Sequence, residues 1–104
     1  MTPKMKRLLD EALKYMGRNH QVFLAVDELA ELQKELLKEA NRGRGDLDKI
    51  VDEAADVFIV LEQILNIYQI HEAVRERITA KLDRMDKRLE YHRKKEVEDG
   101  IAGN

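Results

Sequence analysis

Hydrophobic residues recur along the chain at intervals of three and four, the spacing that places side chains on one face of an α-helix. The first such stripe predicts a helix from about Pro3 to Gly17, since proline suits a first helical turn and glycine a helix end. A second helix is predicted from Asn19, as its N-cap, to the residue before Gly43. Its expected core stripe comprises Val22, Val26, Leu29, Gln33, Leu36 and Ala40.

Two more helices are predicted in the second half. One, from about Leu47 to Ile67, contains the segment 57–61, which is apolar all round, as in helices buried centrally or between subunits. After a break near Tyr68 and Gln69, the last helix carries the stripe Val74, Ile78, Leu82, Met85 and Leu89. The residues from Arg93 onward show no periodicity and are expected to fray. The pattern therefore predicts an all-α protein, an antiparallel bundle of about four helices, with a helical domain over residues 4–92 and a frayed tail over residues 93–104.

Composition narrows the class of protein. A chain of 104 residues supports one domain, and 43% hydrophobic with 38% charged residues is typical of amphipathic helices rather than of a disordered chain. A net charge of -2 provides no field to attract duplex nucleic acid. The longest apolar run is too short for a membrane span, and the charged N-terminus lacks a secretory segment. We therefore expect a cytoplasmic protein that binds neither membranes nor duplex nucleic acid.

Acidic residues form two pairs at helical spacing. Glu28 and Glu31 project from one face of the second predicted helix, and Glu35 continues their line. On the third predicted helix, Glu53 and Asp56 lie on a line that continues into valine and isoleucine. A solvated face would not become apolar in this way, and unpaired half-buried carboxylates are costly. Bound cations would resolve the conflict.

The short loop between the second and third helices makes them antiparallel neighbours, able to bring both acidic pairs to one place. Four carboxylates balance two divalent cations. Because the chain has no cysteine, the ligands must be oxygen or histidine nitrogen, which favours Mg²⁺, or Mn²⁺ as a substitute. Either pair alone is more often ordinary helix surface; the opposed combination favours the metal site.

These two motifs carry a family resemblance. Asp27-Glu28-Leu29-Ala30-Glu31-Leu32, a glycine-containing loop and Asp52-Glu53-Ala54-Ala55-Asp56-Val57 together resemble the signature of the MazG-like nucleoside triphosphate pyrophosphohydrolases. The similarity extends over residues 21–88 and is closest to the short single-domain members. It implies a helical dimer or tetramer that cleaves a nucleotide between the α and β phosphates, releasing a monophosphate and pyrophosphate. Asp27 departs from the family, where many members have glutamate, but it precedes the ligand position.

The resemblance also implies roles for individual residues. Glu28, Glu31, Glu53 and Asp56 are expected to hold the metal; one ion would acidify the attacking water and another would steady the leaving phosphates. Glu28, Glu31 and Glu35 are the candidate catalytic residues, Glu35 either orienting the water, completing a third cation site or remaining a solvated helix charge. The candidate substrate-binding residues are Gln21, for a base edge, and, for the phosphates, Lys38, Lys81, Arg84 and Arg88. A capping role for Gln21 and a solvated edge for the basic residues are the alternatives.

Two other classes are considered. Di-iron carboxylate bundles require Glu-x-x-His on two helices, and no such pair occurs. A non-catalytic helical oligomerisation or regulatory module, in which the acids contact a basic partner, remains the alternative. The all-round apolar segment 57–61 predicts a homo-oligomer, dimer or tetramer, in either case, since so few helices leave it uncovered.

Overall fold

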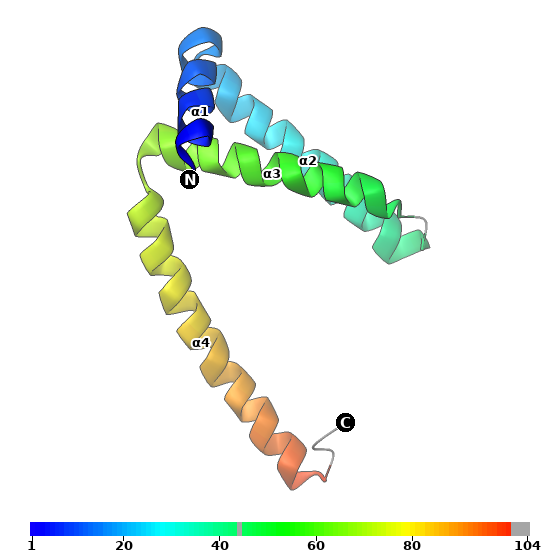
Figure 1. Ribbon diagram of the computed structural model, residues 1–104. Helices are drawn as coiled ribbons and strands as arrows, with labels where there is room; N and C mark the ends of the chain where they lie inside the picture. Colours follow the sequence, from blue (N-terminus) through cyan, green and yellow to red (C-terminus); the bar gives the residue numbers. More distant parts are fainter. Residues whose placement is uncertain (44, 101–104) are drawn as a thin grey trace. The chain divides into compact units, whose positions relative to one another are not determined.

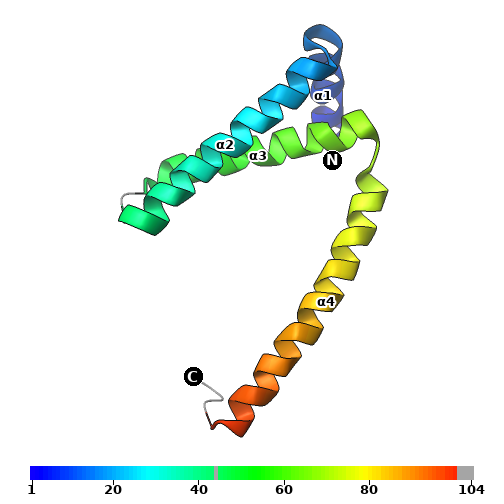
Figure 2. The ribbon, with the colours of Figure 1, turned by 180° about the vertical axis from the view of Figure 1, so that it is seen from behind.

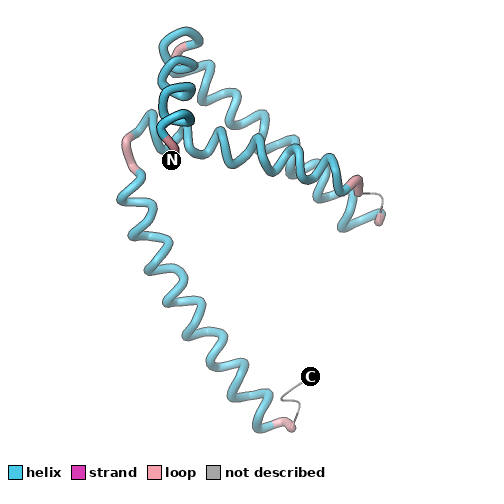
Figure 3. The backbone as a smooth tube through the Cα atoms, viewed as in Figure 1, coloured by secondary structure: helices cyan, strands magenta, loops and turns pink. Residues whose placement is uncertain are grey.

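The computed structural model describes residues 1–43 and 45–100, and within them the chain forms four α-helices and no strand (Figures 1 and 3). This confirms the predicted all-α class. The chain divides into two compact units, Met1–Gln69 and Ile70–Asn104. The first unit contains α1, α2 and α3 with the two acidic motifs, and the second contains α4. No helix among the described residues has a stretch that is both long and apolar enough to span a bilayer.

The first unit begins with α1 (Pro3–Met16), which carries a side-chain cap. Thr2 Oγ1 accepts a hydrogen bond from the backbone N–H of Met5 at 3.1 Å. Gly17, with φ 90°, ends α1 and directly precedes α2 (Arg18–Arg42). Only glycine adopts that conformation readily, so the turn needs no linker. The prediction of Asn19 as the N-cap was wrong: it lies inside the first turn of α2, because the turn is made at Gly17 itself.

α3 (Leu47–Tyr68) runs back along α2, and the two lie side by side in opposite views (Figures 1 and 2). Gly43 ends α2 in the left-handed region, with φ 60°. Asp46 caps α3, its carboxylate accepting hydrogen bonds from two backbone amides of the first turn at 3.0 and 3.4 Å. Between them, Glu39 accepts a hydrogen bond from the N–H of Gly45 at 2.7 Å, where a Cβ would collide with the Glu39 side chain. These contacts close the hairpin.

The face of α2 that packs in the hairpin differs from the predicted core stripe. Its buried residues are Gln21, Ala25 and Glu35. Of the predicted stripe, Val22 is half-buried and the others are exposed, namely Val26, Leu29, Gln33, Leu36 and Ala40. The prediction was wrong because the small side chain of Ala25 and the hydrogen bond of Gln21 bring α3 against the neighbouring, acid-bearing face.

An amide network, formed by the side chains of Gln21, Gln63 and Asn66, joins the three helices at the end of the hairpin remote from its loop. Gln63 is 2% exposed, and its Nε2 donates to the carbonyl of Leu9 at 2.8 Å and to Gln21 Oε1 at 2.9 Å. Its Oε1 accepts a hydrogen bond from Asn66 Nδ2 at 3.1 Å. Since α1, α2 and α3 all contribute, the network sets their register.

Asn66 extends the network to the surface of α1. Its Nδ2 also donates to Asp10 Oδ1 at 3.0 Å, and its Oδ1 accepts from Lys6 Nζ at 2.8 Å. Lys6 and Asp10 form an ion pair at 2.9 Å. The hydrogen bond from Asn66 and the contact with Lys6 lower the pKa of Asp10 below its ordinary value of 3.8. The polar side chains of this region therefore provide one another with partners.

The second unit consists of α4 (His71–Glu98) and the residues that follow it. The predicted break before it is confirmed: α3 ends at Tyr68, and Gln69 adopts a left-handed conformation with φ 52°. No residue of α4 is buried, and its predicted stripe is exposed at Ile78, Leu82, Met85 and Leu89.

The first part of the predicted tail is helical. α4 continues through residues 93–98, the first part of the segment for which the sequence predicts a frayed tail. Arg93 pairs with Asp86 at 3.2 Å. Lys94 pairs with Glu90, four residues earlier, at 3.9 Å, and pairs at that spacing stabilise a helix modestly. Residues 101–104 of the predicted tail lie outside the described residues.

Candidate metal centre

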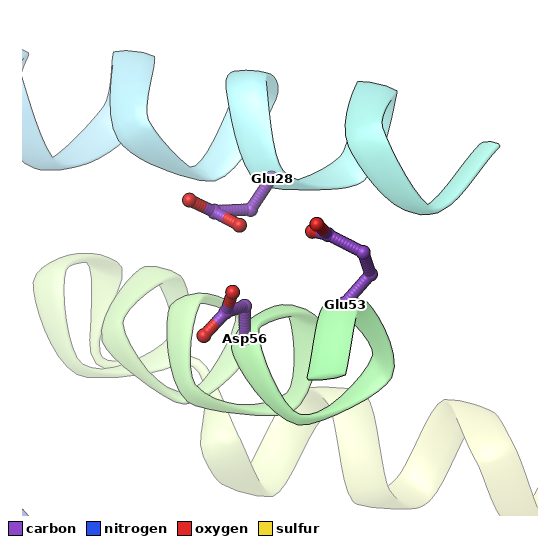
Figure 4. Close-up of side chains that lie close together, drawn as sticks. All are labelled: Glu28, Glu53 and Asp56. Atoms are coloured by element: carbon purple, nitrogen blue, oxygen red, sulfur yellow. The ribbon is translucent and has the colours of Figure 1, made fainter. Parts of the chain in front are cut away.

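Three carboxylates converge from the two facing helices of the hairpin (Figure 4). Glu28 projects from α2, and Glu53 and Asp56 project from α3; one oxygen of each lies within 4.8 Å of the other two. All three residues are half-buried. The structure therefore brings together three of the four residues predicted as metal ligands, and we call these three the acid cluster.

Helical spacing explains why these side chains meet. Glu53 and Asp56 lie three residues apart and so share a face of α3, which also includes the buried Val57 and Val60. Glu28 lies three residues after the buried Ala25 on α2. The apolar packing that holds the hairpin together thus also holds the acids between the helices, partly withdrawn from water.

The pKa of Glu28 reflects its burial and the neighbouring acids. Desolvation by burial raises the pKa of Glu28 above its ordinary value of 4.5, and the charge and hydrogen bond of Asp56 raise it further. The charges of Glu53 and Glu31 act in the same direction. The neighbouring carboxylate of Asp56 therefore disfavours ionisation of Glu28.

Glu53 also has a raised pKa, and one of its carboxylate oxygens has no hydrogen-bond partner. Desolvation by burial raises its pKa above 4.5, followed by the charges of Asp56 and Glu31. Its Oε2 is buried and finds no hydrogen-bond donor among the described residues. A buried carboxylate oxygen without a partner is costly, and native proteins rarely keep one unless an ion or water completes it. This orphan oxygen is what separates the acid cluster from an ordinary charged helix surface.

The other two predicted acids occupy different settings. Glu31 is exposed and lies outside the acid cluster, although its charge raises the pKa of both glutamates within it. Glu35 is only 6% exposed and pairs with Lys38, Oε1 to Nζ, at 3.3 Å. The charge of Glu35 also raises the pKa of Glu53, so it belongs to the same electrostatic site.

The predicted substrate-binding residues come from both units. Gln21 is 6% exposed, with its Oε1 accepting a hydrogen bond from Gln63 and its Nε2 lying 3.3 Å from His20 Nδ1. Lys38 is half-buried beside Glu35. The three predicted phosphate-binding residues on α4 belong to the second unit, where they line one shallow surface depression together with Met85: Lys81, Arg84 and Arg88.

Sequence reasoning did not single out Gln63. It is the most buried polar side chain of the first unit and the partner of Gln21. A signal was available, since Gln63 continues the line of the apolar Val57 and Val60 along the helix. A polar residue at such a position indicates a buried hydrogen bond.

Comparisons with family models, curated proteins and solved structures give no match to this chain. The chemistry of the site therefore has to be judged from its own donor atoms. They are carboxylate oxygens, the ligands of hard divalent cations, and they come from helices whose register is set by the amide network. The three negative charges, the raised pKa values and the orphan oxygen of Glu53 fit a cation such as Mg²⁺ or Mn²⁺.

Proposed function

We propose that the chain is a Mg²⁺-dependent nucleotide pyrophosphohydrolase that converts a nucleoside triphosphate to a monophosphate and pyrophosphate. The observation that carries the proposal is the acid cluster with its orphan oxygen at Glu53. The resemblance of the Glu28-x-x-Glu31 and Glu53-x-x-Asp56 motifs to the MazG-like family supports this choice among metal-dependent reactions.

In this proposal Glu28, Glu53 and Asp56 would hold the cation, with the exposed Glu31 as the fourth predicted ligand. Bound Mg²⁺ supplies a Lewis acid that makes water nucleophilic and offsets phosphate charge. Glu35 would accept a hydrogen bond from the attacking water or help to hold a further cation. No side chain forms a covalent intermediate.

The phosphates need positive charge in addition to the cations. In the first unit, the ammonium group of Lys38 adjoins the site through its pair with Glu35. We assign the β and γ phosphates to Lys81, Arg84 and Arg88, whose common depression on α4 presents three donors to an anion. Gln21 would form a hydrogen bond to the base with the part of its amide that is not engaged by Gln63.

We further propose that the helices form an antiparallel bundle and that the chain assembles into a homo-oligomer, which is either a dimer or a tetramer. The extensive apolar surface of α2 and α3 also favours the second candidate, a non-catalytic oligomerisation module. In that case the acids would contact a basic partner, and purified protein would release no pyrophosphate.

A nucleotide panel tests the reaction. Canonical and damaged nucleoside triphosphates are incubated with the full chain in Mg²⁺, Mn²⁺ or EDTA, and phosphate and pyrophosphate are detected separately. We expect pyrophosphate release in either metal and none in EDTA. Full turnover in chelator would overturn the metal mechanism, and no turnover on any nucleotide would favour the non-catalytic module.

A matched pair of variants tests the site. Glu53→Gln should lower the rate by about 100-fold or more, since it removes a ligand while preserving shape. Asp52→Asn removes the same charge from the adjacent, exposed position and should retain a near-native rate. Equal rates in the two variants would remove Glu53 from the site.

A further inference from the structure

The amide network and the acid cluster occupy matching positions along the two helices of the hairpin. Gln21 lies seven residues before Glu28 on α2, and Gln63 lies seven residues after Asp56 on α3. Because α3 runs back along α2, both steps lead away from the loop (Figures 1 and 2). Seven residues are two helical turns, roughly 10 Å along the axis on nearly the same face, so the hydrogen-bonded pair of Gln21 and Gln63 lies about that far from the acids.

This separation suits the length of a nucleotide. An extended nucleotide covers a comparable length from its α phosphate to the far edge of its base, which carries the substituent on pyrimidine C4 or purine C6. These substituents divide the bases into two kinds, because uracil, thymine, guanine and hypoxanthine have a keto oxygen that accepts a hydrogen bond, whereas cytosine and adenine have an amino group that donates one. With its phosphates at the acid cluster, a nucleotide would bring this substituent to the level of Gln21 on the helix.

Charged and backbone partners fix the direction in which the amides of the network point. An ammonium group only donates, so Asn66 must turn its Oδ1 toward Lys6 Nζ, at 2.8 Å. A carboxylate only accepts, and Asp10 takes a hydrogen bond from Asn66 Nδ2 at 3.0 Å. The backbone carbonyl of Leu9 likewise only accepts, so Gln63 must direct its Nε2 toward that oxygen, at 2.8 Å. Each amide therefore has one orientation.

The same order sets the orientation of Gln21. Because Gln63 Nε2 also donates to Gln21, at 2.9 Å, the atom of Gln21 that faces it must be the oxygen Oε1. Gln21 Nε2 is then directed to the other side, where it lies 3.3 Å from His20 Nδ1. Gln21 is only 6% exposed, whereas His20 is exposed, so the imidazole ring has room to turn away and the amide does not. The network thus holds Gln21 as a hydrogen-bond donor that a ligand can engage in place of His20.

We propose that Gln21 selects nucleotides whose base carries a keto oxygen on pyrimidine C4 or purine C6, by donating a hydrogen bond from Nε2 to that oxygen. The inference rests on the proposed function and names the class of nucleotide on which it acts. An amino group in the same place would oppose two donors beside a nearly buried amide, and a buried donor without an acceptor is costly. The keto base should be favoured by about 10-fold or more. Gln63 is a positioning residue, because it acts on the base only through Gln21.

Matched nucleotides measure the preference on the full chain. UTP and CTP form one pair, and ITP and ATP form another; the first member of each pair has the keto base and the second the amino base. With Mg²⁺, kcat/KM should be higher for the keto member of each pair by about 10-fold or more. Dissociation constants of the corresponding α,β-methylene analogues, measured by calorimetry with Mg²⁺, should follow the same order. Equal values within both pairs, or a preference for the amino members, would overturn the proposal.

The two measurements separate this proposal from the proposed function. Hydrolysis of keto and amino nucleotides at equal rates would leave the pyrophosphohydrolase intact and remove the selection by Gln21. Binding that favours the keto analogues, without hydrolysis of any nucleotide, would remove the reaction and retain the selection. If none of the analogues binds, both proposals are overturned.

A matched pair of variants tests the donor. Gln21→Glu keeps the acceptor that faces Gln63 and replaces the donor with a second acceptor, so the preference should shift toward the amino member of each pair by about 10-fold or more. Gln33→Glu makes the same change at an exposed position of α2 and should keep the preference of the wild type. A keto preference that is unchanged in Gln21→Glu would overturn the proposal.

Gln63→Glu tests the orientation while residue 21 stays unchanged. A carboxylate at position 63 only accepts, so Gln21 would have to turn its Nε2 toward it and present Oε1 to the ligand. The ratio of kcat/KM between the members of each pair should then shift toward the amino base. A purely structural role of Gln63 would instead lower the rates for all four nucleotides alike, and that result in a folded variant would overturn the positioning role. If Gln63→Glu fails to fold, the comparison of Gln21→Glu with Gln33→Glu still decides whether Gln21 selects the base.

Discussion

Two clusters of buried or half-buried polar side chains lie on the same hairpin, the amide network and the acid cluster, and they differ in how well their polar atoms are hydrogen-bonded. In the amide network, Gln63 is almost fully buried, and both ends of its side chain have partners within the protein. Seven residues earlier on the same helix, Asp56 lies in the acid cluster, where Glu53 has an oxygen without a donor. The amides of the network have hydrogen-bond partners within the folded chain, whereas the acid cluster needs a cation or water to satisfy the oxygen of Glu53.

This difference indicates that the amide network, rather than the acid cluster, stabilises the folded chain. Amides provide donors and acceptors together, so a buried group of them needs no outside partner. Carboxylates provide acceptors only and repel one another, so their burial is unfavourable until a cation arrives. Disrupting the network should therefore destabilise the chain, while neutralising the cluster should stabilise it.

The largest effect is expected from Gln63→Leu. The substitution removes the donor to Leu9 O and Gln21 Oε1 and the acceptor of Asn66 Nδ2. At about 1–3 kcal/mol for each buried polar group left unpaired, partly offset by apolar burial, the loss should be on the order of 3 kcal/mol. Urea unfolding of the metal-free protein measures it. A change below about 0.5 kcal/mol would show that the network does not hold the helices together.

Cation binding should give the next largest effect, with the opposite sign. At 100 times the dissociation constant, Mg²⁺ or Mn²⁺ should stabilise the folded state by about 2.7 kcal/mol, because the acid cluster exists only there. Thermal unfolding with and without metal reports the shift. Glu28→Gln and Glu53→Gln should abolish it, and Asp27→Asn, an exposed acid beside Glu28, should preserve it. An unchanged melting temperature in millimolar metal would contradict the site.

A smaller effect should appear in the pH dependence of the metal-free protein. The pKa values of Glu28 and Glu53 are raised on folding, so the folded state holds these protons more tightly than the unfolded chain does. Their favourable contribution is complete below the ordinary value of 4.5 and is lost as the pH rises through the raised values. The melting temperature should therefore increase when the pH is lowered from 7 toward 5.

Glu53→Gln and saturating metal sharpen that measurement. The variant cannot ionise at position 53, so it should melt higher than wild type at pH 7 and respond less to acid. Bound metal should reverse the trend in wild type, since protons compete with the cation. A wild-type melting temperature that falls steadily from pH 7 to pH 5 without metal would contradict the raised pKa values.

Local rules accounted for the helices and for most of the acid cluster. Glycines at 17 and 43 marked real helix ends, and the break at Gln69 followed from a lapse in periodicity. The spacing of Glu53 and Asp56 within one helix, together with a short loop, was sufficient to place Glu28 opposite them. Each of these inferences needs only residues that are near one another in sequence.

The face of α2 could not be derived in this way. Its apolar stripe is the stronger local signal, but Ala25 and the bond between Gln21 and Gln63 decide which side meets α3. That bond joins residues that are far apart in the sequence. The position of Gln63 on the line of Val57 and Val60 was a sequence signal of burial, but its hydrogen-bond partners become visible only after the helices are paired.

The smallest expected effect concerns the boundary of the acid cluster. Lys38 Nζ lies 3.3 Å from Glu35 Oε1, so the ammonium group opposes the arrival of a cation at the neighbouring carboxylates. Lys38→Met should tighten Mn²⁺ binding by about two- to five-fold, the size expected for one partly exposed charge. Lys34→Met, one turn earlier and exposed, removes the same charge away from Glu35 and serves as the control.

If Glu35 binds a cation of its own, titration calorimetry should also show an additional Mn²⁺ per chain in the Lys38 variant. If both lysine variants bind Mn²⁺ as wild type does, Glu35 lies outside the metal centre, and its pair with Lys38 serves only to compensate a buried charge.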